Sequence, residues 1–181
     1  MMKRLMLGAA VVGLSLVAAP AAHAQVGVGV SAGLSMPTGD FGKTFKSGYS
    51  VNGLIGVTMP LSPIGFRGEV GYNSWDGKSD VADGVTASSL SGTANVVLQV
   101  PGMIVAKPYV IGGLGYHRLK LDAGNVANLG NDTQSKLGWN VGGGVNFGLG
   151  TLATMVEARY VTVNTEGGST HYVPITFGIM F

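Results

Sequence analysis

The feature that most constrains the fold is a two-residue alternation of apolar with small or polar side chains. In its clearest instance, apolar residues occupy every second position from Val26 to Met36, and Gly or Ser residues fill the positions between. Successive side chains of a strand point to opposite faces, so this pattern predicts a β-strand with one apolar face. The pattern returns in seven further segments, which we predict as strands at about 51–59, 64–73, 90–100, 108–121, 137–147, 152–161 and 171–181.

The fifth of these segments does not keep a single phase. Tyr109 and Ile111 require one apolar face, whereas Leu114 and Tyr116 require the opposite one. A β-bulge adds one residue to a strand and shifts its phase. We therefore expect a bulge near Gly112 in this strand.

The connections between the predicted strands alternate between short and long. Segments 60–63, 101–106 and 148–151 are short, whereas 37–48, 75–87, 122–135 and 164–170 are longer and polar. A meander with short turns at one end and long loops at the other is typical of bacterial outer-membrane barrels. Backbone groups in lipid must be paired within the protein, so the first and last strands must pair with each other. This explains a strand pattern that continues to Phe181 and predicts an all-β, closed, eight-stranded antiparallel transmembrane barrel.

The first 24 residues have the pattern of a secretory signal peptide. Lys3 and Arg4 precede an apolar stretch over residues 5–19, and Ala22 and Ala24 fit the A-x-A cleavage rule. We therefore expect a signal peptide over 1–24 and a single barrel domain over 25–181. The alternative for this segment is an uncleaved anchor helix, which would be short for a membrane span.

Composition narrows the range of functions. Only 11% of the residues are charged, and Gly accounts for 31 of 181, whereas ordinary globular domains have roughly 25% charged residues and 7% Gly. Removing Lys3 and Arg4 from the 11 basic residues leaves 9, which equals the 9 acidic residues. We expect no nucleic-acid partner, because the mature chain has no basic cluster. The absence of Cys excludes disulfides and thiolate metal sites.

Several motifs resemble a known family, the small eight-stranded outer-membrane barrels of the OmpX, OmpW and opacity-protein type. They are LSMPTGDFG after the first strand, KPYVIGGLGYHR and KLGWNVGGGVNF in the fifth and sixth, and VEARY in the seventh. The resemblance covers the mature chain and implies a location in the bacterial outer membrane, among its lipids and lipopolysaccharide. It also implies periplasmic chaperones and the barrel assembly machinery as partners during biogenesis. The C-terminal residues resemble the signal that this machinery reads, carried by Thr176, Gly178, Ile179 and Phe181.

Four of the few charged residues inside predicted strands lie on polar faces, where they need a partner. Arg67 and Glu69 lie on the polar face of the third strand, and Glu157 and Arg159 on that of the seventh. These strands lie on opposite walls of an eight-stranded barrel, whose interior is just wide enough for side chains to fill it. We predict an ion-pair network across the lumen, with Arg67 paired to Glu157 and Arg159 to Glu69 in some combination. Its role would be a structural plug or, less favoured, a gate or proton path.

Other polar and aromatic residues give weaker indications. Histidines 117 and 171 fall near the loop ends of strands, and we expect both to be solvated. Ser169, Thr170 and Glu166 lie near His171, but no spacing requires a catalytic group. Asp76, Asp80 and Asp83 gather in the second loop, where a divalent cation or solvent could satisfy them. Aromatic residues near strand ends predict girdles at the two membrane interfaces: Tyr49, Tyr72, Trp75, Trp139, Tyr160 and Phe181.

The sequence supports three functional hypotheses. The first is a non-enzymatic outer-membrane protein with a structural, adhesive or envelope-stabilising role through its extracellular loops. The second is a narrow porin-like passage for small solutes, and the third is a lipid-A-modifying enzyme. We favour the first, with no cofactor and no metal.

Overall fold

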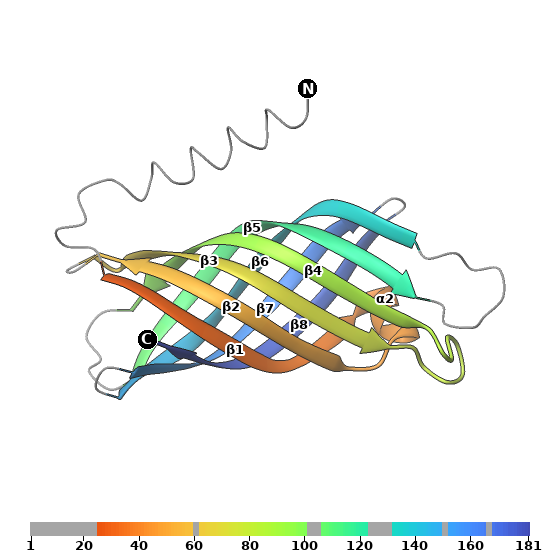
Figure 1. Cartoon of the computed structure of the whole chain (residues 1–181), viewed down its shortest axis with the longest axis horizontal. Helices are drawn as coiled ribbons and strands as arrows, with labels where there is room; N and C mark the ends of the chain where they lie inside the picture. The colour runs from red at the N-terminus through yellow and green to blue at the C-terminus, as the bar shows by residue number, and fades with distance from the viewer. Residues whose placement is uncertain (1–24, 60–61, 101–105, 123–131, 150–151, 166–167) are drawn as a thin grey trace, which may run out of the picture.

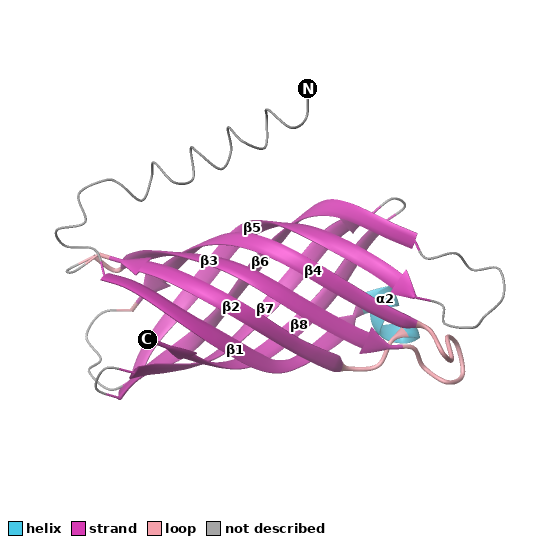
Figure 2. Ribbon diagram, in the orientation of Figure 1, coloured by secondary structure: helices cyan, strands magenta, loops and turns pink. Residues whose placement is uncertain are grey.

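The computed structural model describes residues 25–59, 62–100, 106–122, 132–149, 152–165 and 168–181. They form β1 (Gln25–Thr38), α2 (Gly39–Thr44), β2 (Gly48–Thr58), β3 (Ile64–Asp76), β4 (Thr86–Gln99), β5 (Ala106–Asp122), β6 (Asp132–Leu149), β7 (Leu152–Thr165) and β8 (Gly168–Met180). Each strand pairs antiparallel with the next, and β8 pairs with β1, so the sheet is a closed barrel (Figures 1 and 2). The predicted fold is therefore confirmed. The expected signal peptide lies outside the described residues.

The seam between the first and last strands runs to the final residue of the chain. β1 and β8 are in register over ten residue pairs, from Gly29 opposite Met180 to Thr38 opposite His171. Beyond Met180, the Phe181 amide donates to the Val28 carbonyl at 2.8 Å, and the Val28 amide donates back at 3.1 Å. These bonds extend the paired seam to Val28 of β1 and to Phe181.

The two faces of the barrel differ as the alternation predicts. Large apolar side chains face outward, and several of them are more than half exposed, including Val30, Val70, Leu114 and Leu137. Polar side chains and glycines of the intervening positions face the lumen. None of the helices in the described part of the chain has the length and apolar character needed to span a membrane.

The barrel has two distinct ends. β1 begins and β8 ends at one end, here called the turn end, and α2 lies at the opposite end, here called the loop end (Figure 1). The helix α2 lies within the first long loop and was missed in the sequence, because it spans only six residues and has no apolar periodicity. Loops one and two are joined at the loop end by a bridge between Phe45 and Gly77.

Two expectations about the strands and their connections are wrong. β5 has no bulge, because it keeps one unbroken register with β4 and with β6. Tyr109 and Ile111 are instead buried in the lumen, while Leu114 and Tyr116 face outward. The fourth connection is not long either, because β7 continues to Thr165 and β8 begins at Gly168.

Candidate functional site

The lumen contains the four charged residues singled out in the sequence. Arg67 and Glu69 come from β3, and Glu157 and Arg159 come from β7. All four are buried, with exposed fractions between 2% and 9%. We call these four residues the charge quartet.

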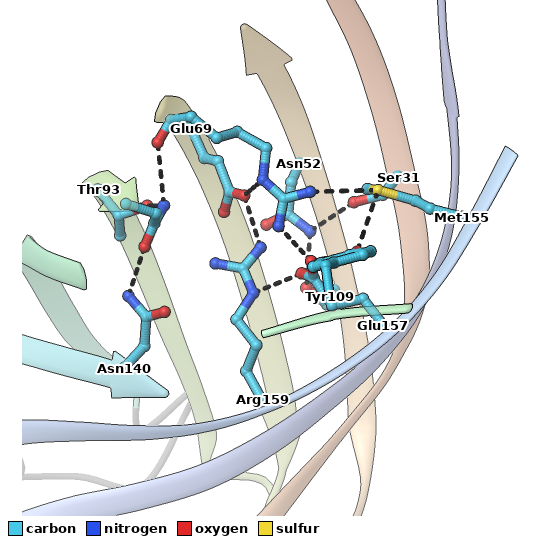
Figure 3. Close-up of polar contacts among 12 residues, drawn as sticks. Ser31, Asn52, Glu69, Thr93, Tyr109, Asn140, Met155, Glu157 and Arg159 are labelled. Atoms are coloured by element: carbon cyan, nitrogen blue, oxygen red, sulfur yellow. Dashed lines mark hydrogen bonds and ion pairs between the residues drawn. The ribbon is translucent and has the colours of Figure 1, made fainter. Parts of the chain in front are cut away.

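The charge quartet forms a closed cycle of ion pairs (Figure 3). Across the lumen, Arg67 Nη2 bonds to Glu157 Oε2, and Arg159 Nη2 donates to Glu69 Oε1 at 2.6 Å. Along β7, Arg159 Nε donates to Glu157 Oε1 at 2.5 Å. Along β3, Arg67 Nε lies 2.7 Å from Glu69 Oε1, an ion-pair contact outside hydrogen-bond geometry. Each arginine therefore contacts both carboxylates, and the formal charges cancel.

Further lumen residues support the charge quartet, and sequence reasoning missed them. Tyr109 Oη donates to Glu157 Oε2 at 2.6 Å, and its ring centre lies 5.7 Å from the Arg67 guanidinium carbon. Asn95 Nδ2 donates to the Arg67 carbonyl at 3.2 Å, and Asn140 Nδ2 donates to Asn95 Oδ1 at 2.9 Å. In the sequence, the only indication that Tyr109, Asn95 and Asn140 belong to this site is the inward phase of these residues in their strands.

Inward-facing glycines of β6 make room for these long side chains. A Cβ atom at Gly144 would lie 2.6 Å from Tyr109 Oη, and one at Gly142 would lie 2.7 Å from both Cα and Cγ of Arg159. Real Cβ atoms do not approach other atoms this closely. The Gly-rich segment of β6 is therefore the surface against which the charge quartet packs.

Between the charge quartet and the loop end lies a small polar chamber. The space open to water in it is about 30 Å³, enough for roughly two water molecules. Asn73 Oδ1, His117 Nδ1 and Asn140 Oδ1 belong to residues lining this chamber and are buried without a hydrogen-bond partner among the described residues. The expectation that His117 is solvated is wrong, since only 2% of it is exposed.

An apolar cluster closes the lumen above this chamber, and we call it the cap. Trp75 is 1% exposed, packs edge-on against Tyr172 with ring centres 4.9 Å apart, and donates from Nε1 to the Ser35 carbonyl at 3.1 Å. The expectation that Trp75 belongs to an outer girdle is therefore wrong, because Trp75 has the inward phase of β3. The buried members of the cap are Phe45, Trp75, Ala87, Val161, Val163 and Tyr172.

At the turn end, the lumen opens into a vestibule of about 750 Å³. Its lining includes the inward-facing residues Thr58, Gln99, Lys107 and Asn146. The vestibule and the chamber lie on opposite sides of the charge quartet. The lumen is thus interrupted twice, by the charge quartet and by the cap.

The outer wall carries aromatic pairs near the loop end. Tyr49 lies next to Tyr72, and Trp139 next to Tyr160, both with ring centres 6.1 Å apart. His171 stacks on Tyr160 at 5.6 Å, and its Nδ1 lies 3.1 Å from Thr162 Oγ1. Within the described residues, no hydrogen bond links His171 to a carboxylate that could orient it as a catalytic base. Ser169 and Thr170 precede it on β8, and Glu166 lies outside the described residues.

The acidic residues of the second loop do not converge on one point. In the described part of the chain, no group of three or more His, Asp or Glu side chains is placed to hold a metal ion. Asp76 Oδ1 accepts a hydrogen bond from Thr86 Oγ1 at 3.4 Å.

The C-terminal motif forms part of the seam. Thr176 and Gly178 face the lumen, whereas Ile179 and Phe181 take the outward phase. Its role as an assembly signal stays a prediction. The proposed cleavage residues Ala22 and Ala24 lie outside the described residues.

The fold and the interrupted lumen define a class of protein, the small membrane-spanning β-barrels. Residues 7–181 match the model of the outer membrane protein beta-barrel domain, and the chain belongs to this family. It is a protein of the bacterial outer membrane, and that membrane is its lipid environment.

Solved structures of outer-membrane barrels share this fold. Neisserial surface protein A matches with a TM-score of 0.62 and 17% identity over 87% of this chain and 97% of its own. A major outer membrane protein from Thermus thermophilus matches with a TM-score of 0.63 and 12% identity over 87% of this chain and 98% of its own. The outer membrane enzyme PagL matches with a TM-score of 0.54 and 17% identity over 84% of this chain and 97% of its own. The comparison with curated proteins returned no match.

Proposed function

We propose that this barrel is a non-enzymatic structural protein of the outer membrane with a lumen that does not conduct, and that it acts through its loop end. The observation that carries this proposal is the double interruption of the lumen. The charge quartet fills one level with paired side chains, and the cap fills a second level with packed rings. An eight-stranded barrel has little interior beyond what its side chains occupy.

The described loops support a role in contacts outside the membrane, adhesive or envelope-stabilising. The Lys46 amide donates to the Asp76 carbonyl at 2.8 Å, and the Lys78 amide donates to the Thr44 carbonyl at 2.9 Å. Lys78 Nζ also donates to the Gly42 carbonyl at 2.7 Å. Loops one and two are therefore held in one arrangement before any partner binds, which lowers the entropic cost of binding.

Ion conductance tests the closed lumen. We expect the protein, refolded into planar bilayers, to give no stable conductance steps, and sugar-loaded liposomes containing it to swell no faster than empty ones. A general porin reconstituted in parallel is the positive control. Large and stable steps from the wild-type barrel would instead support a narrow passage.

The enzymatic alternative has its own test. PagL is an enzyme of the same fold, but this likeness at 17% identity concerns the fold alone. We expect mass spectrometry to find the same lipid A in cells with and without this protein. A change in its acylation would overturn the non-enzymatic proposal.

The outer wall suggests how the barrel holds outer-leaflet lipid. On β5, Arg118 and Lys120 alternate with the buried residue His117 and therefore face outward. They follow Pro108–Tyr116, a stretch of nine residues, which is the length at which a tilted strand crosses the hydrocarbon. The two cations thus lie at headgroup level, where the phosphates of lipopolysaccharide are complementary in charge. Lys120 also approaches Asp122 at 3.4 Å.

We expect the double variant R118Q/K120Q to bind lipid A more weakly than the wild type. Two cations near an anionic surface contribute about 2 kcal/mol, or roughly thirtyfold in affinity. Native mass spectrometry with bisphosphorylated lipid A measures the loss. The variant K43Q/K46Q removes the same charge from the first loop and is expected to bind as the wild type does. Equal binding by both variants would exclude Arg118 and Lys120 as the headgroup contact.

A further inference from the structure

A pocket opens at the loop end of the lumen, directly above the cap. Its volume is about 260 Å³, and we call it the mouth pocket. Two phenylalanines of the first loop and inward-facing residues of the surrounding strands contribute to its lining. The lining residues are Phe41, Phe45, Ala87, Ser88, Leu119, Lys120, Leu121, Gln134, Thr165 and Thr170.

The apolar part of this lining is a partly uncovered aromatic surface. Phe41 packs on Phe45 with ring centres 4.7 Å apart and meets Trp75 edge-on at 5.2 Å. Phe41 and Leu119 pack against the cap but are only partly buried, and 43% of Leu121 is exposed. Covering such apolar surface is favourable, and aromatic rings gain further from edge-to-face and offset contacts.

The polar part of the lining selects a neutral ligand. Thr165 and Thr170 contribute uncharged hydroxyl groups and Gln134 contributes an amide, whereas Ser88, like Lys120, has the phase of the outer wall. Among the described residues of the lining there is no carboxylate, and the one cation among them, Lys120, has the phase of the outer wall and approaches Asp122. A ligand with one or two hydroxyl or amine groups could bond to this rim, whereas a strongly charged ligand would lose hydration without gaining a partner.

Volume sets the size of the ligand. A buried apolar cavity of about 150 Å³ takes up benzene, and sites for drug-sized ligands begin at about 300 Å³. The mouth pocket falls between these values, so it accommodates a single substituted ring and up to about two fused rings.

We propose that the mouth pocket is a binding site for a small, neutral aromatic molecule carrying a hydroxyl or amino group, which enters from outside the cell. The ring would pack against Phe41 and Phe45, and the polar group would bond to the hydroxyl and amide rim. The pocket ends on the cap, so the ligand is held at the mouth and does not pass through the lumen. This site is independent of the closed-lumen proposal, since conductance and binding are measured separately.

The chain contains a reporter for this site. It has two tryptophans. Trp75 lies under the mouth pocket in contact with Phe41, whereas Trp139 lies on the outer wall and 41% of it is exposed. The variant W139F therefore leaves Trp75 as the sole reporter, and W75F leaves Trp139 to report partitioning into lipid or detergent.

The test is quenching of tryptophan fluorescence by 4-bromophenol in lipid vesicles. In W139F we expect saturable quenching that unbrominated phenol reverses, and in W75F quenching that rises linearly with concentration. Adding T170F to W139F fills the pocket and should weaken the saturable quenching by about tenfold or more. Adding V81F instead places the same ring on an exposed position of the second loop, outside the pocket, and should leave quenching unchanged.

Folding of each variant is checked by its shift in gel mobility on boiling, and only folded variants are compared. Should T170F misfold, reversal by phenol in W139F alone decides between the outcomes. Linear quenching of Trp75, or saturable quenching that phenol does not reverse, would overturn the proposed site.

Discussion

Replacing Arg67 with methionine is expected to lower the free energy of unfolding of the barrel in lipid vesicles by about 3–5 kcal/mol. The substitution keeps an unbranched side chain but leaves Glu69 and Glu157 sharing one arginine inside the lumen. Glu157 is 2% exposed, so bulk water does not reach its carboxylate in the folded barrel. Urea titration followed by tryptophan fluorescence and by boiling-dependent gel mobility measures the change.

A second substitution separates pairing from packing. The variant R67M/E157M removes one charge of each sign and leaves Arg159 with Glu69, which are 2.6 Å apart. We expect it to lose less stability than R67M alone, since no unpaired carboxylate remains. K43M, which removes a loop cation whose side chain is 80% exposed, should change the unfolding free energy little. Equal losses in R67M and R67M/E157M would argue against direct coupling of Arg67 to Glu157.

The seam gives the second large effect. An alanine Cβ at Gly33 would overlap the Ile175 carbonyl oxygen and lie 2.7 Å from the Thr176 Cα atom. Both are backbone atoms of β8, so neither can rotate away, and the two strands must separate. We expect G33A to destabilise the barrel by about 3 kcal/mol or to prevent closure.

Gly53 on β2 provides the matched control, because a Cβ there meets no atom within 4 Å. We expect G53A to fold and unfold as the wild type does. The fraction that becomes resistant to unfolding in gel assays, measured after refolding into vesicles, compares the two variants. If G33A and G53A folded to the same extent, the tight approach of β1 to β8 at Gly33 would be wrong.

The fold was predictable because one physical constraint acts on every strand. Lipid on one side and a narrow interior on the other impose the same alternation throughout, so even β6 and β7 were found by phase alone. The same phase placed Arg67 and Glu69 on one inner wall and Glu157 and Arg159 on the opposite one. Predicting their pairing across the lumen then required only the number of strands, which places the third and seventh strands on opposite walls.

Other features depend on three-dimensional packing that phase does not encode. Trp75 is an aromatic residue near a strand end, where the sequence predicts an interfacial girdle, and Tyr109 belongs to a strand whose phase the sequence leaves unclear. They point inward because the lumen is apolar at the cap and beside Val97 and Ile111. The bulge predicted in β5 arose from the same assumption, that apolar residues always face outward. The short helix α2 is held by tertiary contacts, and its six residues have no apolar periodicity from which it could be predicted.

The arrangement of the charge quartet has a consequence for insertion into the membrane. Arg67 and Glu69 are two positions apart on β3, and Glu157 and Arg159 are two positions apart on β7. The two residues of each pair therefore lie next to each other on one face of their strand, whether or not the barrel is closed. Either half of the sheet can thus enter hydrocarbon as an electrically neutral unit, which avoids the penalty of carrying a bare ion through it. The bonds across the lumen join β3 to β7, so they require the two walls to face each other in the closed barrel.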